Sequence, residues 1–437
     1  MDYIFIDEKG PQETIRITTP YNEEKKIKLG NDNMNVYVAN LIKINEKHLH
    51  EIEKKYKMLE KNYMSSRNFR DKDRELKGKD ILDKHFEYGI ASLKGHEINF
   101  YSSLFEILLE NQVDNLLFSI NKMSLVADKR LSDWILKLEE KRFIGSVKLL
   151  KYSIVKYLHI EASESVIQSF FDPNKKNREV LTEIQKDMKA FVDKNKHIQR
   201  MKVQIQNYTE TIETIRKTKH LIQETPFDLV SFDWNKVSFD LDLWITEMDH
   251  ANKASVQSTE LILDEGIPLE PFKKLGFLSI KENEDSAVNV GLRICDVLVV
   301  ISGKYFSKLE IDVRYNKEQP ENRRLLHSEW FKLNEEQFEL IKKMNMFLFP
   351  KNSTYCYIVD TYFDDGLLFE TFFRYISSYG NFIDYNKHLE SHVDQHFEYF
   401  ARQLNFKYHL AVENDLMTRK IYGSTLSGIK AGTVRPI

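Results

Sequence analysis

The sequence predicts an α/β fold in which a mixed sheet is split by a large helical insertion and followed by a mainly helical C-terminal region. Three observations carry this prediction. Short segments rich in β-branched and aromatic residues open the chain, helical spacing dominates residues 125–225, and strand character returns near residue 259. A chain of 437 residues with 42% apolar content is also longer than a single hydrophobic core usually accommodates, so we expect a main domain with substantial additions.

The first 124 residues contain short strand-like runs and two segments with helical spacing. Turn residues separate the early runs and predict an antiparallel meander. Leu49, Ile52, Tyr56, Leu59 and Tyr63 recur at three- and four-residue steps, which indicates an amphipathic helix. The predicted strands are residues 2–7, 13–19, 34–44 and 116–120, and a second helix covers residues 97–110.

Residues 125–225 show helical spacing almost throughout, so we interpret them as an insertion into the main domain. Between Lys129 and Leu221, Lys and Arg exceed Asp and Glu by about eight, while the whole chain has a formal net charge of -3. This local excess fits either a solvated helical face or a surface that follows a nucleic-acid backbone. Both interpretations stay open at this stage.

Strand character returns at residues 259–266, where an apolar run ends in Asp264, Glu265 and Gly266. Residues 276–280 suggest another short strand, and residues 287–309 form a strongly apolar helix that contains Cys295 and Asp296. We therefore divide the chain into a split main domain at 1–124 and 226–310, an insertion at 125–225, and a C-terminal region at 311–437.

Composition narrows the classes of protein that fit. The near-neutral net charge excludes a uniformly basic nucleic-acid-binding chain, so any such binding needs a local patch. Two cysteines, Cys295 and Cys356, cannot build a disulfide framework or a thiolate zinc site. No signal peptide and no apolar run of membrane-spanning length is evident, so we expect a cytoplasmic protein without membrane contact.

Three aspartates stand in apolar surroundings and are the candidate chemical residues. Asp7 lies in the first strand, Asp264 ends a later strand, and Asp296 interrupts an apolar helix, where an unpaired buried charge is costly. Converging carboxylates are what divalent metals need for phosphodiester cleavage. Structural roles compete with this hypothesis: Asp7 as the start of a turn, Asp264 as a helix cap near Pro268, and Asp296 as the partner of Arg293 or a lysine.

A family resemblance supports the chemical interpretation. Residues 3–10 read Tyr-Ile-Phe-Ile-Asp-Glu-Lys-Gly and resemble the Ile-Asp-Glu-Ser-Gly signature of the prokaryotic family called domain of unknown function 3800. Residues 291–298, Gly-Leu-Arg-Ile-Cys-Asp-Val-Leu, resemble that family's closing helix, and residues 262–266 lie where the family carries a strand-end aspartate. The matches come in the expected order and span residues 1–310 around the insertion.

The resemblance implies a ribonuclease-H-like fold and a divalent-metal-dependent nuclease using Mg²⁺ or Mn²⁺, and it suggests a role in prokaryotic defence against mobile elements. Asp7, Asp264 and Asp296 would be the metal ligands. Residues 75–77, Glu-Leu-Lys, resemble a further family segment, which makes Glu75 a fourth candidate and Lys77 a candidate phosphate contact. Two departures bear on activity, since Lys9 stands in place of the usual serine and Cys295 in place of the usual alanine.

Two other functions remain as alternatives. A catalytically inactive ribonuclease-H-like scaffold would keep the fold and bind nucleic acid or a protein partner, with the Tyr- and Phe-rich C-terminal region as a surface for that partner or a second copy. A more distant alternative is a zinc protein built on His388, His392 and His396, which recur every four residues and share one helical face. An exposed or interface face is the simpler explanation of that spacing.

Overall fold

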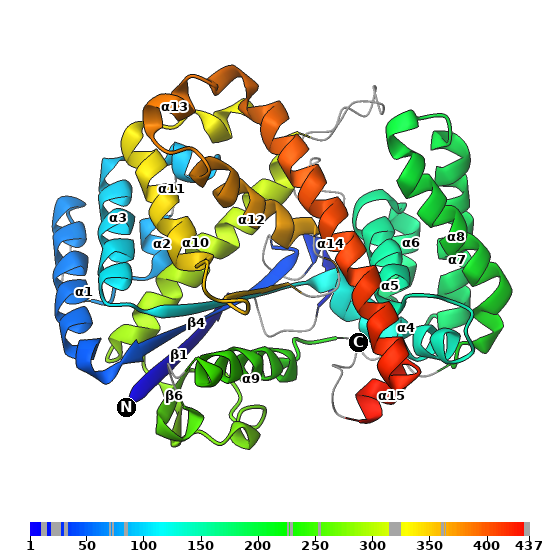
Figure 1. Cartoon of the computed structure of the whole chain (residues 1–437), viewed down its shortest axis with the longest axis horizontal. Coiled ribbons are helices and arrows are strands. Elements are labelled where there is room, and N and C mark those ends of the chain that lie inside the picture. The colour runs from blue at the N-terminus through cyan, green and yellow to red at the C-terminus, as the bar shows by residue number, and fades with distance from the viewer. Residues whose placement is uncertain are drawn as a thin grey trace.

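A six-stranded mixed sheet organises the computed structural model of the chain (Figure 1). The structure describes residues 1–9, 15–18, 28–29, 34–69, 71, 74–82, 86–224, 227, 230–251, 255–313, 325–359, 362 and 364–431. Strand order in the sheet is β7-β6-β1-β4-β5-β8. The strands are β1 (Asp2–Lys9), β4 (Val36–Asn45), β5 (Asp114–Asn121), β6 (Thr259–Asp264), β7 (Ser279–Glu284) and β8 (Tyr357–Val359).

Strand β1 lies in the middle of the sheet, and its neighbour β4 runs opposite to it. β1 pairs antiparallel with β4 and parallel with β6, and β4 pairs antiparallel with β5. The early meander is therefore β1–β4–β5, and the predicted strand at residues 13–19 is not one of its members. Of that segment only residues 15–18 are described, and β2 (Ile17–Thr18) pairs with β3 (Lys28–Leu29) in a separate two-stranded sheet.

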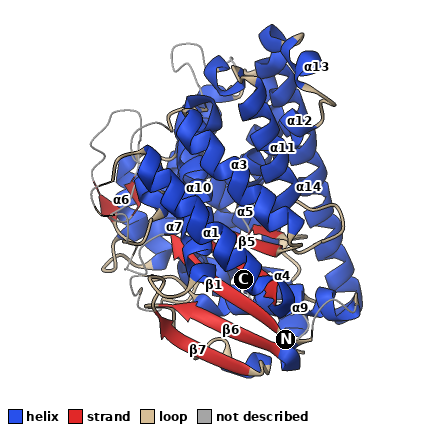
Figure 2. Ribbon diagram, turned by 90° about the vertical axis from the view of Figure 1, so that its left-hand side faces the viewer, coloured by secondary structure: helices blue, strands red, loops and turns tan. Residues whose placement is uncertain are grey.

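Helices cover both faces of the six-stranded sheet, which confirms the predicted α/β class. Alternating side chains of β1 feed two separate cores, with Phe5 on one face and Ile4 and Ile6 on the other. The Phe5 face is covered by α1 (Glu46–Ser66), α2 (Gly78–Ile81), α3 (Gly95–Glu110), α10 (Val290–Asp312), α11 (Glu335–Leu348), α12 (Asp364–Ser377) and α13 (Phe382–Asn386). Figure 2 shows α1, α3 and α10 above strands β1, β6 and β7.

The insertion is helical, as its spacing predicts, and it packs on the Ile4 face of the sheet. Its helices are α4 (Lys122–Glu140), α5 (Val147–Lys156), α6 (Glu164–Phe171), α7 (Asn177–Asn195) and α8 (Lys202–Thr218), and α9 (Trp234–His250) follows on the same face. In Figure 1, α7 and α8 form the right-hand end of the molecule, away from α1 and α3. No described helix has the length and apolarity needed to cross a membrane.

Asparagines at two strand ends start the helices that follow. The Asn45 side chain accepts a hydrogen bond from the Lys47 amide at 3.1 Å, and Asn121 accepts one from the Met123 amide at 2.9 Å. An N-cap side chain satisfies one of the free amides of the first turn. The chain therefore turns directly from β4 into α1 and from β5 into α4, without a loop.

The C-terminal region is mainly helical, but it also contributes the edge strand β8, which the sequence analysis missed. The long helix α14 (His392–Tyr422) crosses the front of the molecule in Figure 1 and leads into α15 (Thr425–Lys430). Asp415 of α14 accepts hydrogen bonds from the Ser146 hydroxyl and from the Lys148 amide, and the Thr425 amide donates to Glu139 at 2.8 Å. These contacts fasten the C-terminal helices to the insertion.

Candidate metal centre

Asp7 and Asp264 lie side by side on neighbouring parallel strands. The register pairs Ile6 with Leu263, so the next residue on each strand is an aspartate. Phe5 and Ile262, two residues earlier, belong to the core beneath α10, and side chains two apart on a strand share a face. Both carboxylates therefore face the α10 side, whereas Glu8, one residue further along β1, belongs to the opposite face.

Asp296 comes from α10, which approaches the same strand closely. Gly291 lies directly against the Phe5 ring, and the Cys295 thiol donates to the Phe5 carbonyl oxygen at 3.5 Å. The Asp296 Oδ2 atom accepts a hydrogen bond of 2.6 Å from the amide of Gly78, the first residue of α2. The structure thus brings α2, α10 and β1 together around Asp296.

Electrostatic interactions link the three aspartates. Burial raises the pKa of Asp7 well above its ordinary value, and the negative charges of Glu8 and then of Asp296 and Asp264 raise that pKa further. Burial also raises the pKa of Asp264 and that of Asp296. The Gly78 amide and the charge of Lys77 oppose the increase in the pKa of Asp296. Negative charge is therefore concentrated in one poorly solvated place.

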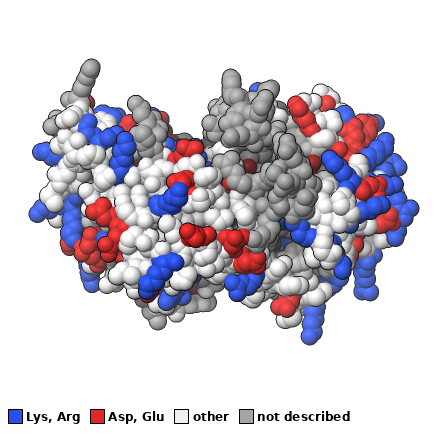
Figure 3. Space-filling model, turned by 90° about the horizontal axis from the view of Figure 1, so that it is seen from above, with Lys and Arg blue, Asp and Glu red and all other residues white. Residues whose placement is uncertain are grey.

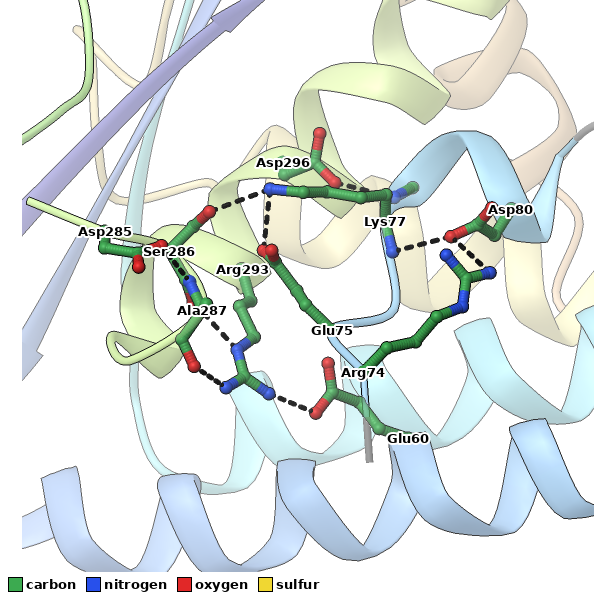
Figure 4. A network of polar contacts seen from close by, with 11 residues as sticks. Glu60, Arg74, Glu75, Lys77, Asp80, Asp285, Ser286, Ala287, Arg293 and Asp296 are labelled. Carbon is green, nitrogen blue, oxygen red and sulfur yellow. Dashed lines mark hydrogen bonds and ion pairs between the residues drawn. The ribbon is translucent and has the colours of Figure 1, made fainter. Parts of the chain in front are cut away.

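Glu75 and Lys77 reach this cluster from the segment before α2. The Lys77 Nζ atom lies 2.8 Å from Glu75 Oε1 and donates to the Ser286 hydroxyl at 2.8 Å (Figure 4). Burial alone would lower the pKa of Lys77, but the carboxylates of Glu75, Asp296 and Asp264 raise it above its ordinary value. Lys77 is therefore a charged ammonium group among the candidate ligands.

The two departures from the family signature have different consequences. The Lys9 side chain lies against Gly303 of α10, and its positive charge lowers the pKa of Asp296. Lys9 therefore adds a second cation to the cluster. Cys295 is fully buried, and burial raises the pKa of its thiol well above the ordinary value. A protonated, buried thiol between α10 and β1 packs the core and leaves the aspartates accessible to one another.

Arg293 stabilises the chain around the cluster without pairing with Asp296. Its Nη1 atom lies 2.8 Å from Glu60 Oε2 of α1, and its Nε donates to the Ser286 carbonyl oxygen at 2.8 Å. A further contact joins it to the Ala287 carbonyl oxygen. Figure 4 shows these contacts holding the β7–α10 connection against α1, next to Lys77. The Asp296–Arg293 pair that competed with the metal hypothesis does not form among these contacts.

Asp7 and Asp264 also do not have the structural roles, turn start and helix cap, that competed with metal binding. Asp7 lies inside β1, which continues to Lys9, so it does not start a turn. Turn and bend residues follow Asp264, and the next helical element is the short 3-10 helix Lys273–Leu275, so Asp264 does not cap a helix. The alternative of a lysine partner for Asp296 holds in part, because the positive charges of Lys77 and Lys9 both lower the pKa of Asp296.

The side chains as they stand do not form a finished metal cage. Among the described residues, no three His, Cys, Asp or Glu side chains are positioned to hold one ion. Asp7 accepts from the Glu8 amide at 2.7 Å and Asp296 from the Gly78 amide, so both are turned toward backbone donors. A shared ion therefore requires these carboxylates to rotate toward a common point.

The donor chemistry nevertheless fits a hard divalent cation. Carboxylate oxygens are the ligands that Mg²⁺ and Mn²⁺ prefer, and the increase that Asp296 and Asp264 cause in the pKa of Asp7 marks negative charge that a cation would stabilise. The hydroxyls of Tyr56 on α1 and Tyr101 on α3 are buried and have no hydrogen-bond partner among the described residues. Burial raises the pKa of both tyrosines, followed by Glu60 and then Asp296 for Tyr56, and by Tyr63 and then Asp296 for Tyr101. Asp7, Asp264, Asp296 and Glu75 are the residues that would hold the ion.

The histidine repeat belongs to the core of the C-terminal region. His392 Nδ1 lies 2.8 Å from the Tyr375 hydroxyl, and His396 is enclosed by aromatic rings that include Phe331 and Phe372. Burial lowers the pKa of His392 to about 4 and that of His396 to about 3. His388 is exposed, but the expectation of an exposed or interface face is wrong for the other two. The three do not gather as zinc ligands.

A second buried polar cluster lies near the opposite end of α10. His159 Nε2 is 3.4 Å from Glu310 and 3.9 Å from Asp365, and Asn121 donates to Asp365 at 2.8 Å. Burial raises the pKa of Asp365 to about 6, although the charge of His159 opposes this increase. Glu310 is fourteen residues beyond Asp296 on one helix, or about 21 Å along its axis, so the two clusters are separate.

Sequence reasoning missed several members of the site. Ser286 and the Gly78 amide carry no sequence signal as partners of Lys77 and Asp296, and the Arg293–Glu60 pair joins residues 233 positions apart. Comparison with protein-family models, with curated proteins and with solved structures finds no match to this chain. The function must therefore be inferred from the residues and their geometry.

Proposed function

We propose that the protein is a divalent-metal-dependent nuclease with a ribonuclease-H-like fold. The observation that carries this proposal is that Asp7 and Asp264 lie side by side on two parallel strands, each one residue beyond the pair Ile6–Leu263, beneath the helix that supplies Asp296. The antiparallel run β1–β4–β5, a later strand parallel to β1 and a closing helix occur in the order that the family resemblance implies.

The residues have distinct roles in the proposed hydrolysis of a phosphodiester bond. Bound Mg²⁺ or Mn²⁺ would polarise the phosphoryl group and lower the pKa of a water molecule. Asp7, Asp264 and Asp296 hold the cation, and Glu75 completes the carboxylate set. Lys77, whose side chain is about one-third exposed, would contact a phosphate oxygen.

The basic insertion is the proposed contact surface for the nucleic-acid backbone. Between residues 175 and 219 there are twelve Lys and Arg against six Asp and Glu. Figure 3 shows many Lys and Arg side chains at the end of the molecule formed by α7 and α8. Backbone contacts of this kind do not depend on base sequence and weaken as salt rises.

A catalytically inactive scaffold is the second candidate, and one observation favours it. Lys77 pairs with Glu75, the charges of Lys77 and Lys9 both lower the pKa of Asp296 without a metal, and Lys9 stands where the family signature has serine. Such internal cations stabilise buried carboxylates by themselves. In this case the chain would bind nucleic acid or a partner protein but leave the phosphodiester bond intact.

A cleavage assay tests the two candidates. End-labelled DNA and RNA, single- and double-stranded, are incubated with the full chain and Mn²⁺, Mg²⁺ or EDTA. The nuclease proposal expects cleavage that EDTA abolishes and that Asp7→Asn and Asp296→Asn each reduce by at least about a hundredfold. Asp242→Asn, which changes an exposed carboxylate on α9, is the matched control and should cleave like the wild type. Binding without cleavage in every metal favours the scaffold.

The contact surface is tested separately by charge reversal. Changing three exposed lysines of the insertion, Lys186, Lys189 and Lys194, to glutamate should weaken nucleic-acid binding. The slope of log affinity against log salt should also fall by about one for each lysine–phosphate interaction that the variant removes. The same change at Lys54, Lys57 and Lys61, which are exposed on α1, is the control. Equal effects of the two triple variants would contradict this surface.

A further inference from the structure

Asn40 of β4 lies directly opposite Asp7 in the sheet. The antiparallel register pairs the two residues, and side chains paired in this way lie on one face with Cβ atoms about 4.5–5.5 Å apart. Val38 and Ile42, two residues to either side of Asn40, belong to the core on the α10 side of the sheet. Asn40 therefore faces α10 beside Asp7, and it is fully buried there.

One end of the Asn40 amide group is paired and the other is not. Its Nδ2 atom donates to Oδ1 of Asn115, on the next strand β5, at 2.8 Å. Asn40 Oδ1 and Asn115 Nδ2 are both buried, and neither has a hydrogen-bond partner in the part of the chain that the structure describes. Buried polar atoms without a partner are rare because they are costly. Since Nδ2 of Asn40 is turned toward β5, its other end is turned away from β5, the side on which β1 and Asp7 lie.

A half-turn of both amide groups exchanges their donors and acceptors without the loss of a hydrogen bond. Asn115 Nδ2 then donates to Asn40 Oδ1, and Asn40 Nδ2 becomes the free group on the side of Asp7. In the structure Asp7 accepts from the Glu8 amide at 2.7 Å, and it must turn from this amide to share a cation. A carboxylate that binds a metal is usually held by a hydrogen bond from a further residue, which fixes its orientation.

We propose that Asn40 is a positioning residue, whose Nδ2 atom donates to the Asp7 carboxylate and holds it in the orientation that binds the cation. This inference rests on the proposed metal site and adds a residue that acts through Asp7. An amide donor suits this place, because it orients a carboxylate without a positive charge that would compete with the cation. Asn115 stays paired with Asn40 in both arrangements of the two amides, so it supports the change.

Mn²⁺ affinity, measured by isothermal titration calorimetry on the full chain, tests this role without depending on activity. Asn40→Leu removes the donor at nearly constant size. Asn115→Leu is the matched control, because it breaks the same amide pair and leaves the Asn40 donor in place. The double variant Asn40→Leu/Asn115→Leu removes both polar groups, so it should keep the fold if a single variant is too unstable. Urea denaturation of each variant separates a loss of folding from a loss of affinity.

We expect Asn40→Leu and the double variant to weaken Mn²⁺ binding by about 10- to 100-fold, and Asn115→Leu to bind within about twofold of the wild type. In a Mn²⁺-bound crystal structure, Asn40 Nδ2 should lie about 2.9 Å from an Asp7 oxygen. Wild-type affinity without Asn40, equal losses in the two single variants, or an Asn40 oxygen bound directly to the ion would overturn the role of Asn40 and leave the metal site intact. Absence of Mn²⁺ binding in the wild type would overturn the proposed metal site and this inference together.

Discussion

Gly291 determines how closely α10 can approach β1, and this approach brings Asp296 toward Asp7. A Cβ atom at Gly291 would lie 2.4 Å from Cδ1 of Phe5 and 2.5 Å from Cε1 and Cγ. Ordinary contacts between carbon atoms are about 3.5–4.0 Å, so Gly291→Ala must separate the helix and the strand by about 1 Å. Phe5 is 2% exposed and belongs to the core on the α10 side of the sheet, so other core side chains must move if its ring does.

The cost of Gly291→Ala follows from two opposing effects. Overpacking of a core typically costs about 1–3 kcal/mol, and a clash with three ring atoms belongs at the upper end. Alanine in place of glycine recovers about 1 kcal/mol within a helix. We therefore expect Gly291→Ala to lower the free energy of unfolding by about 2 kcal/mol. Because Asp296 moves with α10, Mn²⁺ affinity should fall by about tenfold or more.

Urea denaturation followed by tryptophan fluorescence measures the stability, and calorimetry measures the Mn²⁺ affinity. Gly95→Ala is the control, because a Cβ atom at this exposed helical glycine would have no heavy atom within 4 Å. It should be neutral or raise the free energy of unfolding by about 0.5 kcal/mol, without a change in Mn²⁺ affinity. If Gly291→Ala matches the wild type in both measurements, the approach of α10 to β1 does not control the site.

Three further outcomes are expected. The pKa of Asp7 is raised, and its carboxylate must be deprotonated to bind metal. The Mn²⁺ dissociation constant should therefore increase, toward tenfold per pH unit, as the pH falls below that pKa, and Asp7→Asn should flatten this dependence on pH. Arg293→Met leaves the buried Glu60 carboxylate without its partner and should lower the free energy of unfolding, measured by chemical denaturation, by about 3 kcal/mol. Adding Glu60→Gln should recover part of this stability, and no recovery would contradict a direct pair. Asp365 has a pKa of about 6 in the folded protein, so its protonated form contributes stability that is fully present below pH 4 and is lost as the pH rises through 6. Asp365→Asn should therefore reduce the change in melting temperature between about pH 4 and pH 6.

Local patterns in the sequence predict much of the sheet and its helices. Alternation along β1 and β6 places Asp7 and Asp264 on one face, because side chains two residues apart on a strand point the same way. The helical spacing of the insertion predicts its helices for a similar reason. Strand β8 escaped prediction because three residues give no readable alternation, and its place beside β5 depends on a pairing between residues 240 positions apart.

The site is predictable only in part, because its contacts join distant segments. Three aspartates in apolar surroundings indicate a common function, and their positions follow from the elements that carry them. The rotamers of the carboxylates do not follow from the sequence, since they depend on backbone amides such as that of Gly78. The same holds for Lys77, whose side-chain contacts reach 209 positions along the chain to Ser286.

Crystals of the full chain soaked in Mn²⁺ and measured by anomalous diffraction would test most directly whether the aspartates share a cation. We expect one strong anomalous peak with carboxylate oxygens of Asp7, Asp264 and Asp296 at about 2.1 Å from the ion. Asp296 should then have turned from the Gly78 amide. A structure with Mn²⁺ bound elsewhere, and with these carboxylates still facing backbone amides and lysines, would contradict the metal centre.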